Sequence, residues 1–197
     1  MDSNDNEILN LFRSGEREQA FNILMRTYRE RLYWHVRRMV CDHDDTDDIL
    51  QNVFIKVWAA LPDFRGDCSI FTWLYRITTN ETISFLKKKN LHALLSLSDY
   101  SSQMAFRIQD DPYFTGDKMQ MLLQKAIATL PPKQRNVFVM RYFEEMKYEE
   151  IAQVTGITEG ALKASYHHAY EKVTKYLTEH AQGQGPRIRL RSRSASR

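Results

Sequence analysis

The chain has 197 residues, of which 43% are hydrophobic and 27% charged, a composition typical of a soluble globular protein with one or two domains. Five glycines and four prolines fall in residues 1–180, too few for the frequent turns of an all-β fold, so helices are expected. The formal net charge is +3, but residues 181–197 hold five arginines and no acid, which leaves −2 on the first 180 residues. A generally basic protein that coats nucleic acid is therefore excluded, and any DNA contact must come from a local patch.

Cysteine usage and hydropathy indicate the compartment. Cys41 and Cys68 lie far apart without a CxxC motif, which favours reduced thiols in a cytosolic protein. No apolar run approaches the roughly 18 residues of a membrane span, and the acidic N-terminus lacks a signal-peptide core. We therefore expect a cytoplasmic protein with no direct membrane insertion. His35, Cys41 and His43 lack a fourth ligand for zinc, so neither a metal nor a cofactor is expected.

The first half of the chain predicts three helices. Apolar residues at three- and four-residue steps predict helix over 6–40, with a break at Ser14-Gly15. The acidic run 42–48 leads into a second predicted helix over about 46–60, with Thr46 as its N-cap and the following aspartates in its first turn. Ser69 is predicted to cap a third helix, which runs to about Lys89 and ends in a lysine run.

The second half is predicted to be a separate helical domain. Residues 91–116 lack a sustained period and contain serine, aspartate, proline and glycine, which favours a flexible linker with a short ordered turn at 91–97. The sequence then predicts helices over about 118–129, 133–144, 148–154 and 158–178. The expected fold is all-α, with domains at 1–90 and 117–180, a linker at 91–116, and a disordered Arg/Ser tail at 181–197.

A helix-turn-helix is the strongest functional signal. Ala152 supplies the small residue where two helices cross, and Gly156 supplies a left-handed turn four positions later. Ile151, Ile157 and Leu162 supply the apolar contacts between the helices. A plain helical hairpin remains the alternative. The second helix is expected to enter the major groove of DNA through Thr158, Glu159, Lys163, Ala164, His167 and His168.

Two further patterns lie in the first half. Aromatic, basic and amide side chains around the 63–68 loop suit single-stranded DNA, in which bases stack on aromatic rings while lysines follow the phosphates. Core packing is the alternative for Trp73, and a solvated helix end is the alternative for the lysine run. The acidic helix at 46–60 indicates either simple helix capping or an interface with a basic protein partner. A calcium loop is excluded, because Leu50 stands where the sharp turn requires glycine.

These motifs together resemble bacterial RNA polymerase sigma factors of the extracytoplasmic-function (ECF) group. The stretch TDDILQNVFIKVW at 46–58 is similar to that family's polymerase-binding helix. Phe-Arg-Gly at 64–66 and TWLYRI at 72–77 are similar to its minus-ten segment. LPPKQR at 130–135, YEEIA at 148–152 and GALK at 160–163 are similar to its minus-thirty-five domain. The resemblance covers about residues 6–178 in the order that the family has.

The resemblance implies roles for individual residues. Core-polymerase binding is implied for Asp47, Asp48, Gln51, Asn52 and Phe54. Contact with minus-ten DNA is implied for Phe64, Arg65, Asp67, Arg76, Asn80, Lys87 and Lys88. The six residues of the predicted recognition helix would read the minus-thirty-five element, while Asp110 and Asp111 would lie toward the RNA channels of polymerase. Departures from the family pattern occur at Asn52, Ser165 and His168, where the family often has glutamate, arginine and arginine.

The implied function is that of an alternative sigma factor, which binds core RNA polymerase, directs it to specific promoters and assists promoter melting. The implied partners are core polymerase, promoter DNA and an anti-sigma factor. The alternative is a helix-turn-helix regulator with a helical interaction domain, although a regulator has no need for the patterns of the first half. An enzyme is not expected, because the phosphate-binding, zinc-protease and serine-hydrolase motifs are absent. The Arg/Ser tail is either an expression remnant or a phosphate-seeking arm.

Overall fold

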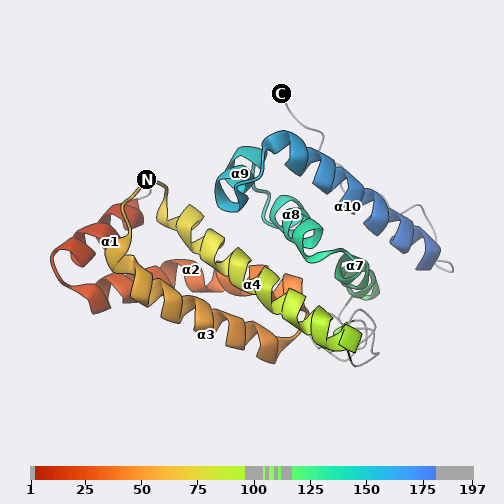
Figure 1. Cartoon of the computed structure of the whole chain (residues 1–197), viewed down its shortest axis with the longest axis horizontal. Helices are drawn as coiled ribbons and strands as arrows, with labels where there is room; N and C mark the ends of the chain where they lie inside the picture. The colour runs from red at the N-terminus through yellow and green to blue at the C-terminus, as the bar shows by residue number, and fades with distance from the viewer. Residues whose placement is uncertain (1–2, 96–103, 105–106, 109–110, 112–116, 181–197) are drawn as a thin grey trace.

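The computed structural model describes residues 3–95, 104, 107–108, 111 and 117–180, and over these residues its regular structure is helical throughout (Figure 1). The helices of the first half are α1 (Ser3–Arg13), α2 (Arg17–Val40), α3 (His43–Ala60), the short 3₁₀ helix η1 (Leu61–Asp63) and α4 (Ile70–Leu95). Those of the second half are α7 (Lys118–Ala128), α8 (Pro132–Tyr142), α9 (Tyr148–Thr155) and α10 (Glu159–His180). The predicted all-α fold is confirmed.

Helix α3 begins three residues before its predicted start. Asp42 has extended backbone and its carboxylate accepts a hydrogen bond from the Asp45 amide at 2.8 Å, so Asp42 is the N-cap. Thr46 was predicted to be the cap, but it lies inside the helix, where its hydroxyl donates to the Asp42 carbonyl. The first turn therefore contains Asp44 and Asp45, and Asp47 lies one turn later than predicted.

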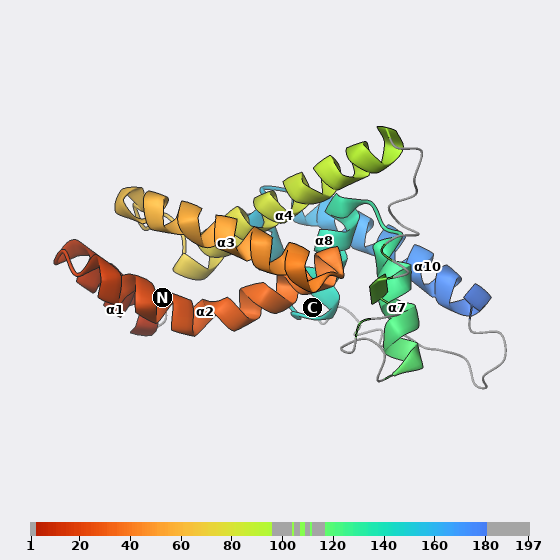
Figure 2. The same ribbon diagram turned by 90° about the horizontal axis from the view of Figure 1, so that it is seen from below.

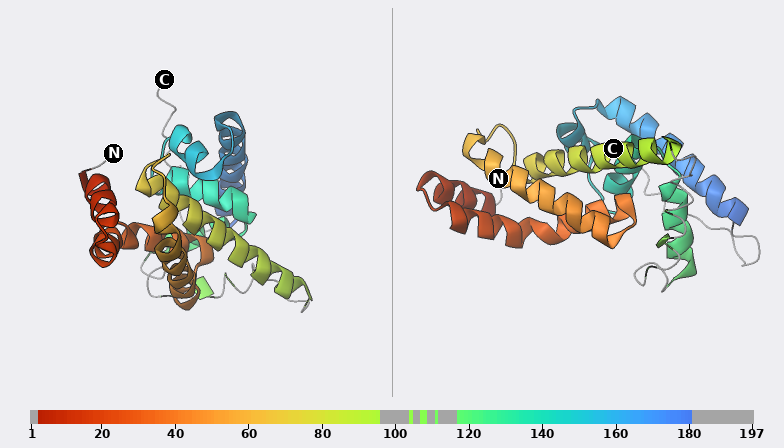
Figure 3. Two further views of the ribbon diagram at one scale, coloured as in Figure 1. Left: turned by 60° about the vertical axis from the view of Figure 1, so that its left-hand side comes forward. Right: turned by 60° about the horizontal axis from the view of Figure 1, so that its bottom comes forward.

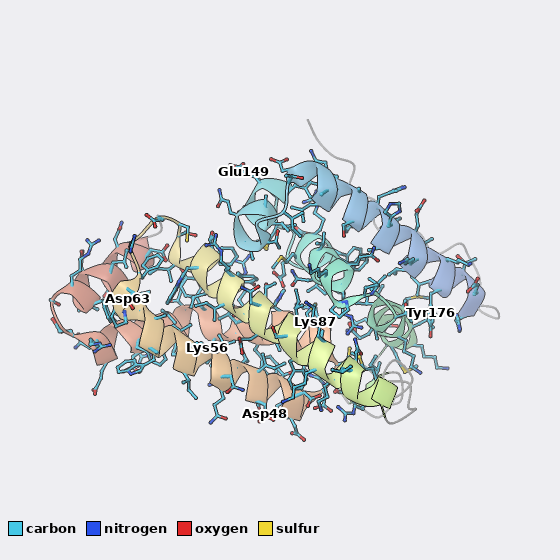
Figure 4. The ribbon with its side chains drawn as sticks, viewed as in Figure 1. Asp48, Lys56, Asp63, Lys87, Glu149 and Tyr176 are labelled. Atoms are coloured by element: carbon cyan, nitrogen blue, oxygen red, sulfur yellow. The ribbon has the colours of Figure 1, made fainter. Side chains whose placement is uncertain are left out.

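Helix α4 is longer than the sequence suggested. Ser69 starts it as predicted, because its hydroxyl accepts a hydrogen bond from the Thr72 amide at 3.1 Å. The helix then continues to Leu95, so the lysine run does not end it, and the turn predicted at 91–97 is helical through Leu95. Lys87 therefore lies within α4 (Figure 4). The lysine run cannot be the solvated helix end considered above.

The helices of the second half begin and end close to their predicted positions. Asp117 caps α7 by accepting a hydrogen bond from the Met119 amide at 2.8 Å. Pro131 and Pro132 separate α7 from α8, because proline fits the first turn of a helix but not its interior. Gly156 ends α9 with a φ of 72°, the left-handed conformation that glycine adopts without steric cost.

The two groups of helices pack directly against each other. Helix α4 contacts α8 and α9, while α2 contacts α7 and α8, so buried side chains of both groups join one apolar core. Figures 2 and 3 show α2–α4 beside α7–α10 in each view. Within the predicted linker, Met104 and Ile108 are fully buried in this core. The proposed domain boundaries therefore divide a molecule whose halves touch.

Two structural findings bear on the compartment and redox predictions. Cys41 is buried, Cys68 is half-buried, and neither forms a disulfide. Among the helices that the structure describes, none is long and apolar enough to span a membrane. The tail predicted to be disordered, at 181–197, lies outside the described residues.

Candidate protein and DNA interfaces

The outer face of α3 carries polar side chains around an apolar centre. Asp48, Gln51 and Asn52 are exposed, and they share this face with Ile55 because helix positions three, four and seven apart align. Ile55 is 61% exposed and Trp58, at the edge, 38% exposed. Figure 4 shows Asp48 at the outer edge of the first half, away from Glu149 of α9. We call these five residues the outer face of α3.

Phe54 differs from the other predicted polymerase-binding residues. Its side chain is half-buried and lies 6.4 Å from the Phe21 ring, edge to face, so it packs α3 against α2. Ile55 is the exposed apolar side chain next to it. Sequence reasoning missed Ile55, although its position four residues after Gln51 and seven after Asp48 was a usable signal.

The acidic run at the start of α3 divides into inward and outward carboxylates. Asp45 is buried and accepts hydrogen bonds from Lys89 Nζ at 3.1 Å and Arg107 Nη1 at 3.1 Å. Asp42 also accepts from Arg107, at 3.0 Å. Asp47 and its neighbours at 44 and 48 are exposed. The outward carboxylates alone are available to a basic partner, and the third lysine of the 87–89 run is structural.

Helix α4 presents a basic and amide face. Arg76, Asn80 and Lys87 are exposed and align along one side of the helix, while Lys88 is exposed about a quarter turn away. Arg76 does not point freely into solvent, because its Nη2 donates a hydrogen bond to the Gln153 carbonyl of α9 at 2.7 Å. We call Arg76, Asn80 and Lys87 the Arg76 face of α4.

The loop before α4 supplies the remaining predicted minus-ten residues. Arg65 and Asp67 are exposed on either side of Gly66, whose φ of 82° turns the chain sharply. Phe64 is half-buried, with its ring 5.0 Å from the Trp73 ring. Phe64 of the loop and Trp73 of α4 therefore form an aromatic pair beside the exposed Arg65, an arrangement suited to an unstacked base.

Helices α9 and α10 form the predicted helix-turn-helix. The Lys147 amide donates to the Glu150 carboxylate at 2.7 Å, which caps α9 at its start. Ile151 and Leu162 are fully buried, and Ile157 is partly buried against the same core, so the expected apolar contacts fix the angle between the helices. A plain helical hairpin, the alternative considered above, does not require a left-handed turn with apolar contacts on both sides.

All six predicted recognition residues are exposed on the first turns of α10 or just before them. Lys163 Nζ lies 5.6 Å from the centre of the Tyr148 ring and 3.5 Å from a Glu159 carboxylate oxygen. The rings of His167 and His168 lie 3.2 and 3.7 Å from the carboxylate of Glu171. Lys163 therefore lies exposed between the Tyr148 ring and the Glu159 carboxylate.

A buried ion pair joins the two halves of the molecule. His35 Nδ1 of α2 lies 2.7 Å from Glu144 Oε1, and both side chains are at least 95% buried. Burial alone would raise the pKa of Glu144, but His35, Tyr75 and Arg31 together outweigh it, so this pKa lies below its usual value. Burial, together with the Glu144 charge, raises the pKa of Tyr75 beside the pair. Within the described residues, His35 Nε2 and Glu144 Oε2 find no hydrogen-bond partner.

Two further buried side chains of the second half bind backbone carbonyls of α2. Arg135 donates to the Met39 carbonyl of α2 at 2.6 Å, to the Ala128 carbonyl at the end of α7 and to the Leu130 carbonyl at 3.2 Å, so one guanidinium meets the ends of two helices. Gln124 donates to the Arg38 carbonyl at 2.7 Å. Sequence reasoning missed these residues, because no local pattern shows which carbonyls a distant side chain will meet.

A metal site does not form from the histidines considered in the sequence. His35 binds Glu144, while His43 Nδ1 lies 2.9 Å from the Tyr33 hydroxyl. Over the described parts of the chain, there is no group of three or more histidine, cysteine, aspartate or glutamate side chains arranged to hold a metal ion.

Comparison with known protein families assigns the two halves separately. The family model described as Sigma-70 region 2 matches residues 24–91, which span α2 to most of α4. The model described as Sigma-70, region 4 matches residues 120–173, which span the helices around the helix-turn-helix. The two models occur in the order that the sequence motifs suggested.

Curated relatives match over most of the chain. ECF RNA polymerase sigma factor SigW of Bacillus subtilis is 28% identical over 170 residues, which cover 82% of this chain and 91% of SigW. RNA polymerase sigma-H factor of Pseudomonas aeruginosa is 27% identical over 183 residues, which cover 88% of this chain and 93% of that protein.

Solved structures share the fold. The structure of CnrH in complex with the cytosolic domain of CnrY matches with a TM-score of 0.64 and 22% identity, covering 90% of this chain and 99% of CnrH. The sigma factor RpoE of Bartonella quintana, solved with the anti-sigma factor NepR, matches with a TM-score of 0.62 and 20% identity, covering 80% and 96% of the two chains. With both family regions present in order, this chain belongs to the sigma-70 family of RNA polymerase sigma factors, in its extracytoplasmic-function group.

Proposed function

We propose that this chain directs core RNA polymerase to specific promoters through three separate surfaces, one for the polymerase and two for DNA. The observation that carries the proposal is the succession of an exposed acidic helix, a basic helix face and a helix-turn-helix in one chain that matches both sigma-70 regions. A simple regulator needs only the last of these. The chain acts as a non-enzymatic subunit, and its place of action is the cytoplasm, with RNA polymerase.

The outer face of α3 is the surface that we assign to core polymerase. Its exposed carboxylate and amides, with the neighbouring carboxylates of Asp44 and Asp47, favour a basic and polar partner, and charge complementarity of this kind sets register and association rate. Ile55 supplies an apolar centre and Trp58 an aromatic side chain at the edge, both of which suit a binding hot spot. Phe54, although half-buried, supports this face by packing against α2.

The Arg76 face and the loop before it are assigned to the minus-ten element. Lys87 and Lys88 follow the phosphates, while Phe64, Arg65 and Asn80 receive an unstacked base. Asp67 is exposed beside Arg65 and supplies a carboxylate that accepts from an exocyclic amino group. Extruding a base from the duplex costs a few kcal/mol, and contacts of this kind must offset that cost.

The first turns of α10 are assigned to the minus-thirty-five element. Lys163 suits guanine O6 and N7, and Ala164 is small enough to meet a thymine methyl group. Thr158, Glu159, His167 and His168 surround them on the exposed side of the helix-turn-helix. The proposal extends to an anti-sigma partner, since the related RpoE was solved with one.

The direct test is transcription in vitro with purified core polymerase on genomic promoter fragments. We expect transcripts that depend on this chain and begin downstream of a shared pair of sequence elements. Binding to duplex DNA by the chain alone, without association with core polymerase, would instead support a helix-turn-helix regulator.

A further inference from the structure

A cation and a carboxylate lie side by side at the start of α10, within the surface assigned to the minus-thirty-five element. Lys163 Nζ is 3.5 Å from Glu159 Oε2, and the two side chains are 58% and 50% exposed. Glu159 is the first residue of α10 and Lys163 follows one turn later, so both project from the turns that would enter the major groove. The proposed guanine contact accounts for the lysine, but not for the carboxylate beside it.

The position of Lys163 is fixed by an aromatic ring as well as by this ion pair. Its Nζ lies 5.6 Å from the centre of the Tyr148 ring, close enough for a cation–π attraction. The guanidinium of Arg141 lies 5.0 Å from the centre of the same ring, and the Tyr166 ring meets it edge to face at 6.4 Å. Arg141 Nη1 in turn donates to the Met146 carbonyl at 2.9 Å. Lys163 is therefore ordered before DNA binds, which reduces the entropy lost on binding.

The carboxylate of Glu159 restricts what this surface can bind. Phosphates are negatively charged, so a carboxylate on a helix that faces DNA weakens binding to every sequence unless it meets a hydrogen-bond donor. In the major groove the donors are the exocyclic amino groups, N4 of cytosine and N6 of adenine. A helix that enters the groove with Glu159 in its first turn is therefore expected to place this carboxylate on one of these amino groups.

One base pair matches a cation and a carboxylate that lie next to each other. The major-groove edge of a G·C pair presents the guanine acceptors N7 and O6, followed by the cytosine donor N4. A lysine over the guanine and a glutamate over the cytosine satisfy all three groups. The reversed pair would set the carboxylate against the guanine acceptors, and an A·T pair places its donor between two acceptors, so both leave unfavourable contacts.

Resting on the proposed function, we propose that Glu159 and Lys163 together read one G·C base pair of the minus-thirty-five element. Lys163 donates to guanine O6 and N7, while Glu159 accepts from cytosine N4. Tyr148 is a positioning residue, which keeps Lys163 beside Glu159. Because the two charges differ in sign, this reading pair specifies which strand carries the guanine as well as the identity of the base pair.

A second ion pair of the same spacing on α10 provides a matched control. Lys175 Nζ lies 3.9 Å from Glu179 Oε1, near the end of the helix and four turns beyond the reading pair. Pairs of this kind stabilise a helix slightly whether or not it binds DNA. Glu179→Ala therefore removes the same type of contact away from the proposed DNA surface.

The test is transcription by the full chain with core polymerase from a promoter library randomised over the minus-thirty-five element. We expect Glu159→Ala and Lys163→Ala each to lower the preference for G·C over C·G about tenfold, and at the same position, since each removes half of one base-pair contact. The double variant should lose little more than either single variant, because residues that act as a unit are not additive. Glu179→Ala should keep the parent preference.

Two further measurements separate base reading from helix stabilisation. Glu159→Ala removes a charge that repels phosphate, so promoters without the preferred G·C pair should bind the holoenzyme about twofold more tightly than they bind the parent holoenzyme. Tyr148→Leu should weaken the preference about threefold at the same position, whereas Tyr148→Phe keeps the aromatic face and with it the preference. If Tyr148→Leu instead relaxes every position alike, Tyr148 supports the fold and does not position Lys163.

The outcomes distinguish this reading pair from the function on which it rests. A parent preference without a G·C position overturns the pair, as does relaxation of different positions by Glu159→Ala and Lys163→Ala. The same holds if Glu159→Ala keeps the preference as Glu179→Ala does. In each of these cases the sigma function stands, because the parent chain still drives transcription. If the parent chain supports no promoter-dependent transcription, the proposed function fails and the reading pair fails with it.

Discussion

The outer face of α3 and the Arg76 face of α4 belong to the same half of the molecule, yet they differ in availability. The α3 face is exposed along its length and carries an apolar side chain that is 61% exposed at its centre. On the α4 face, Asn80 and Lys87 are exposed, but Arg76 is already hydrogen-bonded to the Gln153 carbonyl of α9. A single fold can therefore leave one binding surface without internal partners while a cation of another is already hydrogen-bonded.

The largest expected effect comes from removing the cation that joins the halves. Arg135→Ala leaves three buried carbonyl contacts unmade, and since each buried acceptor left without a partner costs about 1–3 kcal/mol, we expect the free energy of unfolding to fall by about 3–5 kcal/mol. Urea unfolding measures this fall in the free energy of unfolding. Lys133→Ala, an exposed change in the same helix, should stay within about 0.5 kcal/mol of the parent. Equal stability of the two variants would remove Arg135 from the contact between the halves.

Changing the α3 face should instead cost binding and not stability. For the double variant Asp48→Lys, Gln51→Ala we expect affinity for core polymerase to drop more than tenfold, since lost charge contacts cost about 2–5 kcal/mol. The thermal midpoint should not change. Competition against the parent for core polymerase measures the loss, with Asp63→Lys on the adjoining η1 as an exposed control. A double variant that competes as well as the parent would make this face a solvated helix surface.

Base preference at the minus-thirty-five element is expected to depend on the recognition helix α10 and on neither face of the first half. Lys163→Ala should relax base preference at one or two positions of the minus-thirty-five element, because a good base contact is worth about 1–3 kcal/mol of discrimination. His168→Ala, if it loses only phosphate contact, should weaken all promoters alike. A randomised minus-thirty-five library transcribed by each variant makes the measurement. An unchanged preference with Lys163→Ala would mean that α10 reads DNA shape instead of base edges.

Ile55, the apolar centre of the α3 face, is expected to contribute to core binding. Ile55→Ala should weaken core binding by about 1–2 kcal/mol, the cost expected of the minority of interface residues that contribute strongly to binding. Stability should not fall, because the side chain is already exposed. Met119→Ala on α7 is the matched control, an exposed apolar residue outside the proposed interface. Isothermal titration against core polymerase separates the two variants, and equal affinities would confine binding to the polar rim.

The smallest effect concerns a tyrosine that touches neither face. Burial, with neighbouring Tyr148, raises the pKa of Tyr166 to about 12, against about 10 in an unfolded chain. The folded state keeps the phenol proton more tightly, so this contribution to stability is complete below about pH 10 and is lost as pH rises toward about 12. Tyrosinate absorbance and unfolding across this range measure it. Tyr166→Phe should remove that part of the pH dependence, and an unaltered profile would contradict the assignment.

Local chemistry made most of the helices predictable. Ser69 and Asp117 accept hydrogen bonds from backbone amides within three residues, and Gly156 adopts a local left-handed turn. Their positions therefore predict where helices begin or end. The prediction of Thr46 as the N-cap was wrong, because Asp42, four residues earlier, caps the same helix. The exposed recognition residues followed from the helix-turn-helix pattern, while Asp48, Gln51 and Asn52 of the outer face of α3 followed from the family resemblance.

Long-range polar contacts were beyond the reach of sequence reasoning. His35 was considered with other potential zinc ligands, but its partner is a carboxylate 109 positions along the chain. Arg76 was predicted to meet DNA, and no nearby residue indicated its contact with the Gln153 carbonyl. Such pairs depend on how two helical groups pack, and apolar spacing within each group does not determine that.

The carbonyl contacts of Arg135 also have a consequence for folding during synthesis. A helix leaves its last carbonyls without partners inside the helix, and those of α2 at Arg38 and Met39 are met by Gln124 and Arg135. During translation the first half leaves the ribosome before these side chains exist, so the end of α2 stays hydrated until α8 emerges. The first half can collapse early, but its final turn is completed by the second.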